Sequence, residues 1–223
     1  MKGDAGMMPR LMMMGLGALL PAMPANAHPH IFVDTQIEIN FDPQGRADGV
    51  RVTWTYDDLT SLQFIADRGL DADFDGALTD AENAALSGFD MDWEEGYAGD
   101  TYVLLGAAPV QLSGPSDWTA SYQNDKITSS HLRRLTEPVA IGPEPLVVQV
   151  YDPTLYSGYY IVGEPKLTGT SDCQITVQRP DLHVANARLD AAIAALPGDA
   201  ENDFPALGAA FAEEVRVTCA ARS

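Results

Sequence analysis

Acidic side chains recur at fixed intervals in one short segment of the sequence, residues 71–82, which reads DADFDGALTDAE. Asp71, Asp73 and Asp75 occupy positions one, three and five, and Glu82 occupies position twelve. A glycine stands at position six, where the backbone has to turn sharply. Oxygen ligands at this spacing are typical of an EF-hand calcium loop. The segment therefore predicts one calcium site, with ligands from Asp71, Asp73, Asp75, the Ala77 carbonyl, Thr79 and Glu82.

Both flanks of this 71–82 loop favour helix, which is the context that an EF-hand requires. Residues 59–68 carry apolar side chains at helical spacing, behind aspartates that can cap the first turn. Thr79 and Glu82 also have the spacing of a capping box for a second helix. Because the chain has a single loop of this kind, we expect a structural rather than a regulatory calcium ion. A loop that no longer binds metal is the alternative.

The first 27 residues have the three parts of a cleavable export signal. Lys2 and Arg10 supply a basic region, an apolar stretch LMMMGLGALL follows, and the small-residue motif ANA stands at 25–27. The apolar stretch is about half of the ~20 residues that a membrane span needs, so we expect no transmembrane segment after processing. The signal predicts a periplasmic protein of the Gram-negative type. Residues 28–223 then have the length of one domain.

Cleavage after residue 27 would create a second candidate metal site at the new N-terminus. The amine and imidazole of His28 can chelate one ion, since an N-terminal amine deprotonates easily near neutral pH. His30 lies two residues further on the same face of an extended strand, and Asp34 continues that face. Zinc, nickel, cobalt and copper are the ions that such ligands suit. The alternative is an N-terminus that simply has no fixed structure.

Charge and composition argue against several other functions. The chain has 13 basic and 32 acidic residues, a net charge of −19. Loss of the signal removes two basic residues and one acidic residue, which makes the net charge −20. Such a surface repels phosphate backbones, so we expect no nucleic-acid partner. Met91 is the one methionine that remains, which argues against copper(I) held by thioethers. No nucleophile motif is evident, and no catalytic residue is assigned.

The two cysteines, Cys173 and Cys219, are expected to form a disulfide. An even number of cysteines in an exported chain favours pairing, because the compartment is oxidising. A pair of thiolate metal ligands is the alternative.

Most of the sequence after the signal has the apolar–polar alternation of β-strands. Residues 30–41 and 50–56 alternate on either side of a turn and predict a hairpin. Further short strands are expected at 101–105, 110–112, 118–122, 127–135, 146–151, 156–162, 173–177 and 214–219. Residues 182–196 favour a helix, and 206–212 a helical turn. The expected fold is α+β and β-rich: sandwich-like antiparallel sheets with an EF-hand-like helix–loop–helix insert at 58–88 and a C-terminal helical segment.

Three segments together resemble a bacterial family known as domain of unknown function 1007. They are the segment HPHIFVD at 28–34, the 71–82 loop, and VYDPT at 150–154 followed by Tyr156. The resemblance covers nearly all of the mature chain. It implies a periplasmic metal-binding accessory protein that works with an inner-membrane permease for zinc, nickel or cobalt. It carries His28, His30, Asp34 and Asp152 into the candidate metal-binding set; for Asp152, a carboxylate that caps a local turn is an equal alternative.

Two other classes of function remain open at this point. An N-terminal histidine on a β-rich domain also suits a copper enzyme that holds its metal through a histidine brace. That site needs a second histidine, for which His131 or His183 is available. A calcium-stabilised interaction or adhesion module is the third class.

Overall fold

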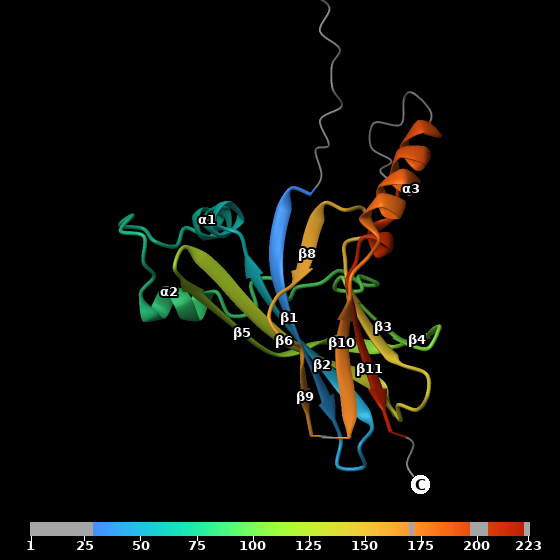
Figure 1. The fold of residues 1–223 in the computed structure, drawn as a ribbon. Helices are drawn as coiled ribbons and strands as arrows, with labels where there is room; N and C mark the ends of the chain where they lie inside the picture. The colour runs from blue at the N-terminus through green and yellow to red at the C-terminus, as the bar shows by residue number, and fades with distance from the viewer. Residues whose placement is uncertain (1–28, 170–171, 197–204, 221–223) are drawn as a thin grey trace, which may run out of the picture.

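A computed structural model describes residues 29–169, 172–196 and 205–220 of the chain. The proposed signal peptide, including His28, lies outside this part. The described residues form two β-sheets with three α-helices around them (Figure 1). The helices α1 (Asp58–Asp67) and α2 (Asp80–Ala85) lie at one side of the molecule, and α3 (Leu182–Ala194) lies at the other.

The larger sheet has the strand order β5-β6-β2-β1-β8. A sixth strand, β9, also pairs with β1, further along the strand than β8. Its antiparallel part is built from a long β1–β2 hairpin and a β5–β6 hairpin that joins it through β2. The strands β8 and β9 instead run parallel to β1. The strand bounds are β1 Ile31–Phe41, β2 Ala47–Tyr56, β5 Leu112–Gln123, β6 Lys126–Val139, β8 Ser157–Ile161 and β9 Lys166–Thr168.

The smaller sheet is antiparallel throughout, with the order β10-β11-β7-β3-β4. Its strands are β3 Thr101–Leu105, β4 Ala108–Val110, β7 Leu146–Val150, β10 Cys173–Gln178 and β11 Glu214–Cys219. A short 3-10 turn, η1 (Gly208–Ala210), precedes β11, where the sequence predicted a helical turn.

The core lies where the inner faces of the two sheets meet. In β1 the buried side chains alternate from Val33 to Phe41, as the sequence predicted, and Thr35 is buried with them. The completely buried Val148 and Val217 come from the smaller sheet. The prediction of a β-rich α+β fold is therefore confirmed. The expected pairing was antiparallel, but β8 and β9 run parallel to β1. The sequence of a short strand does not reveal which strand it will pair with.

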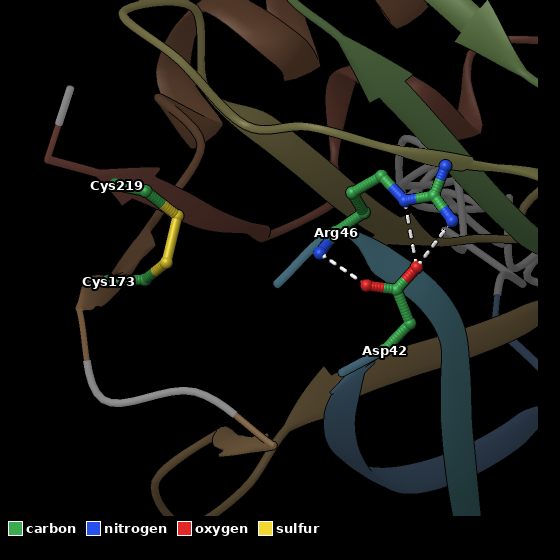
Figure 2. Close-up of a disulfide and its surroundings, with 4 residues drawn as sticks. All are labelled: Asp42, Arg46, Cys173 and Cys219. Carbon is green, nitrogen blue, oxygen red and sulfur yellow. Dashed lines mark hydrogen bonds and ion pairs between the residues drawn. A yellow bond between two sulfur atoms is a disulfide. The ribbon is translucent and has the colours of Figure 1, made fainter. Parts of the chain in front are cut away.

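Two links, which Figure 2 shows together, fasten one end of the fold. Cys173 and Cys219 face each other across β10 and β11 and form the expected disulfide, which spans 46 positions of sequence. At the β1–β2 turn, Asp42 accepts hydrogen bonds from the backbone N–H of Arg46 at 2.8 Å and from its guanidinium at 2.8 Å. These hydrogen bonds hold the pKa of Asp42 below its ordinary value.

Candidate functional site

The 71–82 loop connects α1 to α2, and hydrogen bonds from side chains fix the start of each helix. Asp57 caps α1 by accepting from the backbone N–H of Thr60 at 2.9 Å. Thr79 caps α2 and forms the expected capping box with Glu82. The helix α2 has only six residues, so the insert is a helix–loop–helix with a short second arm.

The carboxylates of Asp71, Asp73 and Asp75 converge within this loop. One oxygen atom of each lies within 4.8 Å of the others, which is close enough for all three to bind the same metal ion. Within the described residues, no other group of three or more histidine, cysteine, aspartate or glutamate side chains is this compact. All three side chains are exposed or only partly buried, so an ion would reach them directly from solvent.

Backbone hydrogen bonds to the same carboxylates shape the loop. Asp71 accepts from the N–H groups of Asp75 at 3.0 Å and Gly76 at 3.3 Å, and Asp75 accepts from Ala77 at 2.8 Å. Gly76 has φ = +80°, a conformation that costs a glycine little. The sharp turn expected at position six is therefore present, and it brings the three carboxylates to one side.

Glu82 belongs to the same loop, but both of its carboxylate oxygens accept hydrogen bonds from Asp71 and Thr79. One carboxylate oxygen accepts from the backbone N–H of Asp71 at 2.9 Å. The other accepts from the N–H of Thr79 at 2.9 Å and from its hydroxyl at 2.7 Å. The bonds from Thr79 hold the pKa of Glu82 below its ordinary value, so the group is ionised near neutral pH. Binding a metal ion would require this carboxylate to turn from these donors towards the three aspartates.

A few polar contacts attach the insert to the sheets. The Asn83 side chain donates to the Leu78 carbonyl at 3.2 Å and accepts from the backbone N–H of Tyr122, in β5, at 2.9 Å. On α1, the buried Ser61 hydroxyl accepts from the N–H of Ile127, in β6, at 2.9 Å. The loop itself projects into solvent while both of its helices are fixed to the β5–β6 hairpin.

The N-terminal histidine motif is only partly described. His28 lies outside the described residues, and His30 is exposed at the start of β1. The ring of His30 lies 4.9 Å from the ring of Tyr156, and its backbone N–H donates to the Tyr156 carbonyl at 2.8 Å. Asp34 is exposed two residues beyond Phe32, which stacks on Tyr160. The transition-metal site at His28, His30 and Asp34 therefore stays a prediction.

The parallel pairing of β1 with β8 explains why the first and third of the motifs belong together. Ile31 pairs with Ser157, so the segment at 28–34 runs directly beside the segment that follows VYDPT. Asp152 accepts from the backbone N–H and hydroxyl of Thr154 at 2.7 and 2.8 Å and from the N–H of Ser157 at 3.1 Å. This is the local turn role that the sequence left open for Asp152.

The two remaining histidines lie in different surroundings. His131 is completely buried in β6, with its ring 4.8 Å from Trp54 and 5.4 Å from Trp93. Burial, together with the charge of Arg133, lowers the pKa of His131 to about 3, so the ring is neutral at ordinary pH. His183 is exposed in the first turn of α3. His131 is thus a core residue in this fold.

The sequence analysis did not identify two acidic residues that line a cavity, the partly buried Asp90 and the buried Asp100. Both line a cavity beside the larger sheet, together with several aromatic side chains. Only the composition of residues 89–102, FDMDWEEGYAGDTY, could have pointed to these two residues, because it mixes acidic and aromatic residues. The mixture has no regular period. Neither a helical nor a strand pattern could assign these side chains to the interior.

The chain belongs to the family described as protein of unknown function (DUF1007), whose model matches residues 13–219. Nearly the whole chain is covered, as the three motifs indicated. No curated protein matches the chain. None of the helices in the described residues is long and apolar enough to cross a membrane.

Proposed function

We propose that this protein is an exported metal-binding accessory protein that binds one calcium ion in the 71–82 loop and serves a transition-metal permease of the inner membrane. The observation that carries the proposal is the convergence of the Asp71, Asp73 and Asp75 carboxylates in a loop with EF-hand spacing.

Calcium is the ion that this set of ligands suits best. The candidate ligands are all oxygen atoms, and calcium takes six to eight of them in a flexible arrangement. Three like charges close together repel one another, and a divalent cation would remove this repulsion. Glu82 would supply two more oxygens by turning from Thr79, while the Ala77 carbonyl and Thr79 complete the set. A bound ion would then tie α1 to α2 and stiffen the insert.

Calorimetry with calcium-free protein tests the calcium site. We expect about one calcium ion per chain, with a dissociation constant between roughly 10⁻⁶ and 10⁻³ M, the range of sensor and extracellular sites. Asp73→Asn should weaken binding about ten-fold or more, because a charged ligand becomes a neutral one. Asp80→Asn is the matched control, since Asp80 is exposed at a loop position that supplies no ligand. No binding at millimolar calcium, or equal losses in both variants, would contradict the site.

The transport role rests on family membership and on the exposed position of the histidine motif. Cleavage after residue 27 would place the His28 amine and imidazole next to His30, which the structure holds at the surface against Tyr156. The mature protein would bind zinc, nickel, cobalt or copper there and pass the ion to, or accept it from, the permease. Binding should weaken below about pH 6, because the imidazoles and the amine take up protons.

Three forms of the protein test this second site in zinc and copper(II) titrations. The native N-terminus should bind most tightly. A form that keeps a methionine before His28 should bind more weakly, because the free amine moves away from the imidazole, and His30→Ala should also lose affinity. Equal affinity in all three forms would contradict the N-terminal site and leave the calcium site unaffected.

A further inference from the structure

A cavity of about 340 Å³ lies against the larger sheet, away from the 71–82 loop. Its walls come from β1, β2 and β8, from the segment between α2 and β3, and from the connection between β7 and β8. Aromatic side chains make up much of this wall, among them Trp54, Tyr56, Trp93 and Tyr97. The volume is at the lower end of the range of about 300 to 1,000 Å³ that small-molecule sites occupy.

Two carboxylates, one of them partly buried and one buried, belong to the same wall. One oxygen of Asp90 accepts from the hydroxyls of Tyr56 at 2.8 Å and Ser129 at 2.5 Å. Asp100, only 6 % exposed, accepts from the Tyr159 hydroxyl at 2.7 Å. Neither carboxylate forms an ion pair with a basic side chain in the described part of the chain. Burial raises the pKa of both groups, because enclosure disfavours the charged form of a carboxyl group.

The cavity wall also holds one donor and one acceptor that no described residue satisfies. The indole Nε1 of Trp54 has no hydrogen-bond partner there, although Trp54 is only 3 % exposed. The second oxygen of Asp90 is likewise buried and without a partner. Such groups are rare in native interiors, because each one costs free energy when it leaves water. A wall with an unsatisfied anionic acceptor and an unsatisfied N–H donor suits a ligand that carries a cationic donor and an oxygen acceptor.

The arrangement favours an organic cation over a metal ion. The carboxylates of Asp90, Asp100 and Asp152 do not form a compact group of the kind found at the 71–82 loop. Aromatic faces attract ammonium ions and offer nothing to a hard metal ion. One such cation–π contact is present at Trp93, where the Arg133 guanidinium lies 4.8 Å from the centre of the ring. Arg133 gives its hydrogen bonds to the carbonyls of Ser113 and Ala98, which leaves the two carboxylates for another cation.

We propose that the cavity beside the larger sheet binds a small organic cation of the amino-alcohol class. Its ammonium group contacts the carboxylates of Asp90 and Asp100 among the aromatic rings, and its hydroxyl oxygen accepts from the indole N–H of Trp54. This site is independent of the calcium loop and of the N-terminal histidines.

Two probes of equal length test the proposal on the wild-type protein. They are 4-amino-1-butanol and 1,4-butanediol, which differ in having an ammonium group or a second hydroxyl at one end. Titration is followed by calorimetry and by tryptophan fluorescence, because Trp54 and Trp93 both line the cavity. We expect the amino alcohol to bind and to change the fluorescence, and the diol to bind at least about ten-fold more weakly, because it lacks the charge.

Asp100→Asn is the matching variant, with Asp67→Asn as its control. The asparagine keeps an oxygen that can accept from Tyr159, whereas the negative charge is lost, so affinity for the amino alcohol should fall about ten-fold or more. Asp67 is exposed on α1, and its replacement should leave affinity unchanged. Equal binding of the two probes, equal losses in the two variants, or no response of the wild type at about 10 mM amino alcohol would overturn the proposal.

Discussion

The 71–82 loop and the cavity beside the larger sheet contain the same functional group, the carboxylate, in opposite surroundings. In the loop, Asp71, Asp73 and Asp75 lie at the surface, two residues apart, and one short segment brings them together. In the cavity, Asp90 and Asp100 are largely enclosed and meet tyrosines from β2 and β8 that are far away in sequence. Carboxylates in a hydrated loop suit a small hard ion, whereas carboxylates enclosed by aromatic rings suit an organic cation.

The two regions also respond to protons in opposite ways. Hydrogen bonds from Thr79 lower the pKa of Glu82 in the loop. Burial raises the pKa of Asp90 and of Asp100 in the cavity. The loop therefore favours the ionised carboxylate, and the cavity wall disfavours it. A metal ion would strengthen an existing preference at the loop, while a cationic ligand would offset a cost at the cavity.

The largest expected difference between the regions is in their contribution to folding stability. Trp54→Ala should lower the free energy of unfolding by about 3–5 kcal/mol, because it removes a buried ring that contacts His131 and Tyr159. Phe74→Ala, at the tip of the loop, should change it by less than about 0.5 kcal/mol, since Phe74 is 89 % exposed. Denaturant unfolding without calcium measures both values. Similar losses in the two variants would show that the loop tip packs in solution.

Removal of the disulfide should affect the stability of the whole fold without affecting calcium binding in the 71–82 loop. Replacing both Cys173 and Cys219 by serine should lower the free energy of unfolding by roughly 3–4 kcal/mol, because the cross-link closes a long loop of chain. The 71–82 loop is built from local contacts, so its calcium affinity should not change as long as the protein is folded. Unfolding curves and calcium titrations of the same variant check both statements. A large loss of calcium affinity would mean that the loop depends on the rest of the fold.

Asn83 is the contact that links the loop to the larger sheet. Asn83→Ala should cost about 1–3 kcal/mol of stability, because it leaves the Tyr122 N–H without its partner. Asn83→Asp is the control, since it keeps an acceptor for Tyr122 and loses the donor to the Leu78 and Thr79 carbonyls. Unfolding in calcium-free buffer should place the aspartate variant between wild type and alanine. If alanine has no effect, the insert is attached by other contacts.

The smallest expected effect is a difference in how stability depends on pH. For Asp100 the folded-state pKa is raised, so stability falls as pH rises from the unfolded value towards the folded one, and stays lower above it. Asp100→Asn should remove this fall and be neutral or slightly stabilising at pH 7. For Glu82 the pKa is lowered, so its contribution is present above the unfolded value and is lost as pH falls through the folded one.

Glu82→Gln should therefore change the acid limb of the stability curve in the opposite sense to Asp100→Asn. Denaturant unfolding of calcium-free protein at several pH values between about 3 and 7, a range that includes the ordinary carboxyl pKa values, measures both variants. If the two variants change the curve in the same direction, the contrast between the regions is wrong.

Much of the fold and one of the two regions followed from local patterns. The alternation in β1, the caps of α1 and α2, the turn at Gly76 and the pairing of Cys173 with Cys219 all appear as the sequence predicted. The first three features depend on residues that are neighbours in sequence. The disulfide could be predicted because the chain has only two cysteines, which leaves one possible pair. The export signal and the His28 site are also local patterns, but they lie outside the described residues and stay predictions.

Tertiary structure alone decided the parallel placement of β8 beside β1, the burial of His131 and the cavity. The sequence offered His131 as a metal ligand, and only the packing of β6 against Trp54 and Trp93 made it a core residue. Asp90 and Asp100 stand in a segment without periodicity, and their partners Tyr56 and Tyr159 come from β2 and β8 of the larger sheet. A local pattern can encode a loop whose ligands are neighbours in sequence, whereas a cavity lined by β1, β2 and β8 exists only after these distant strands have paired.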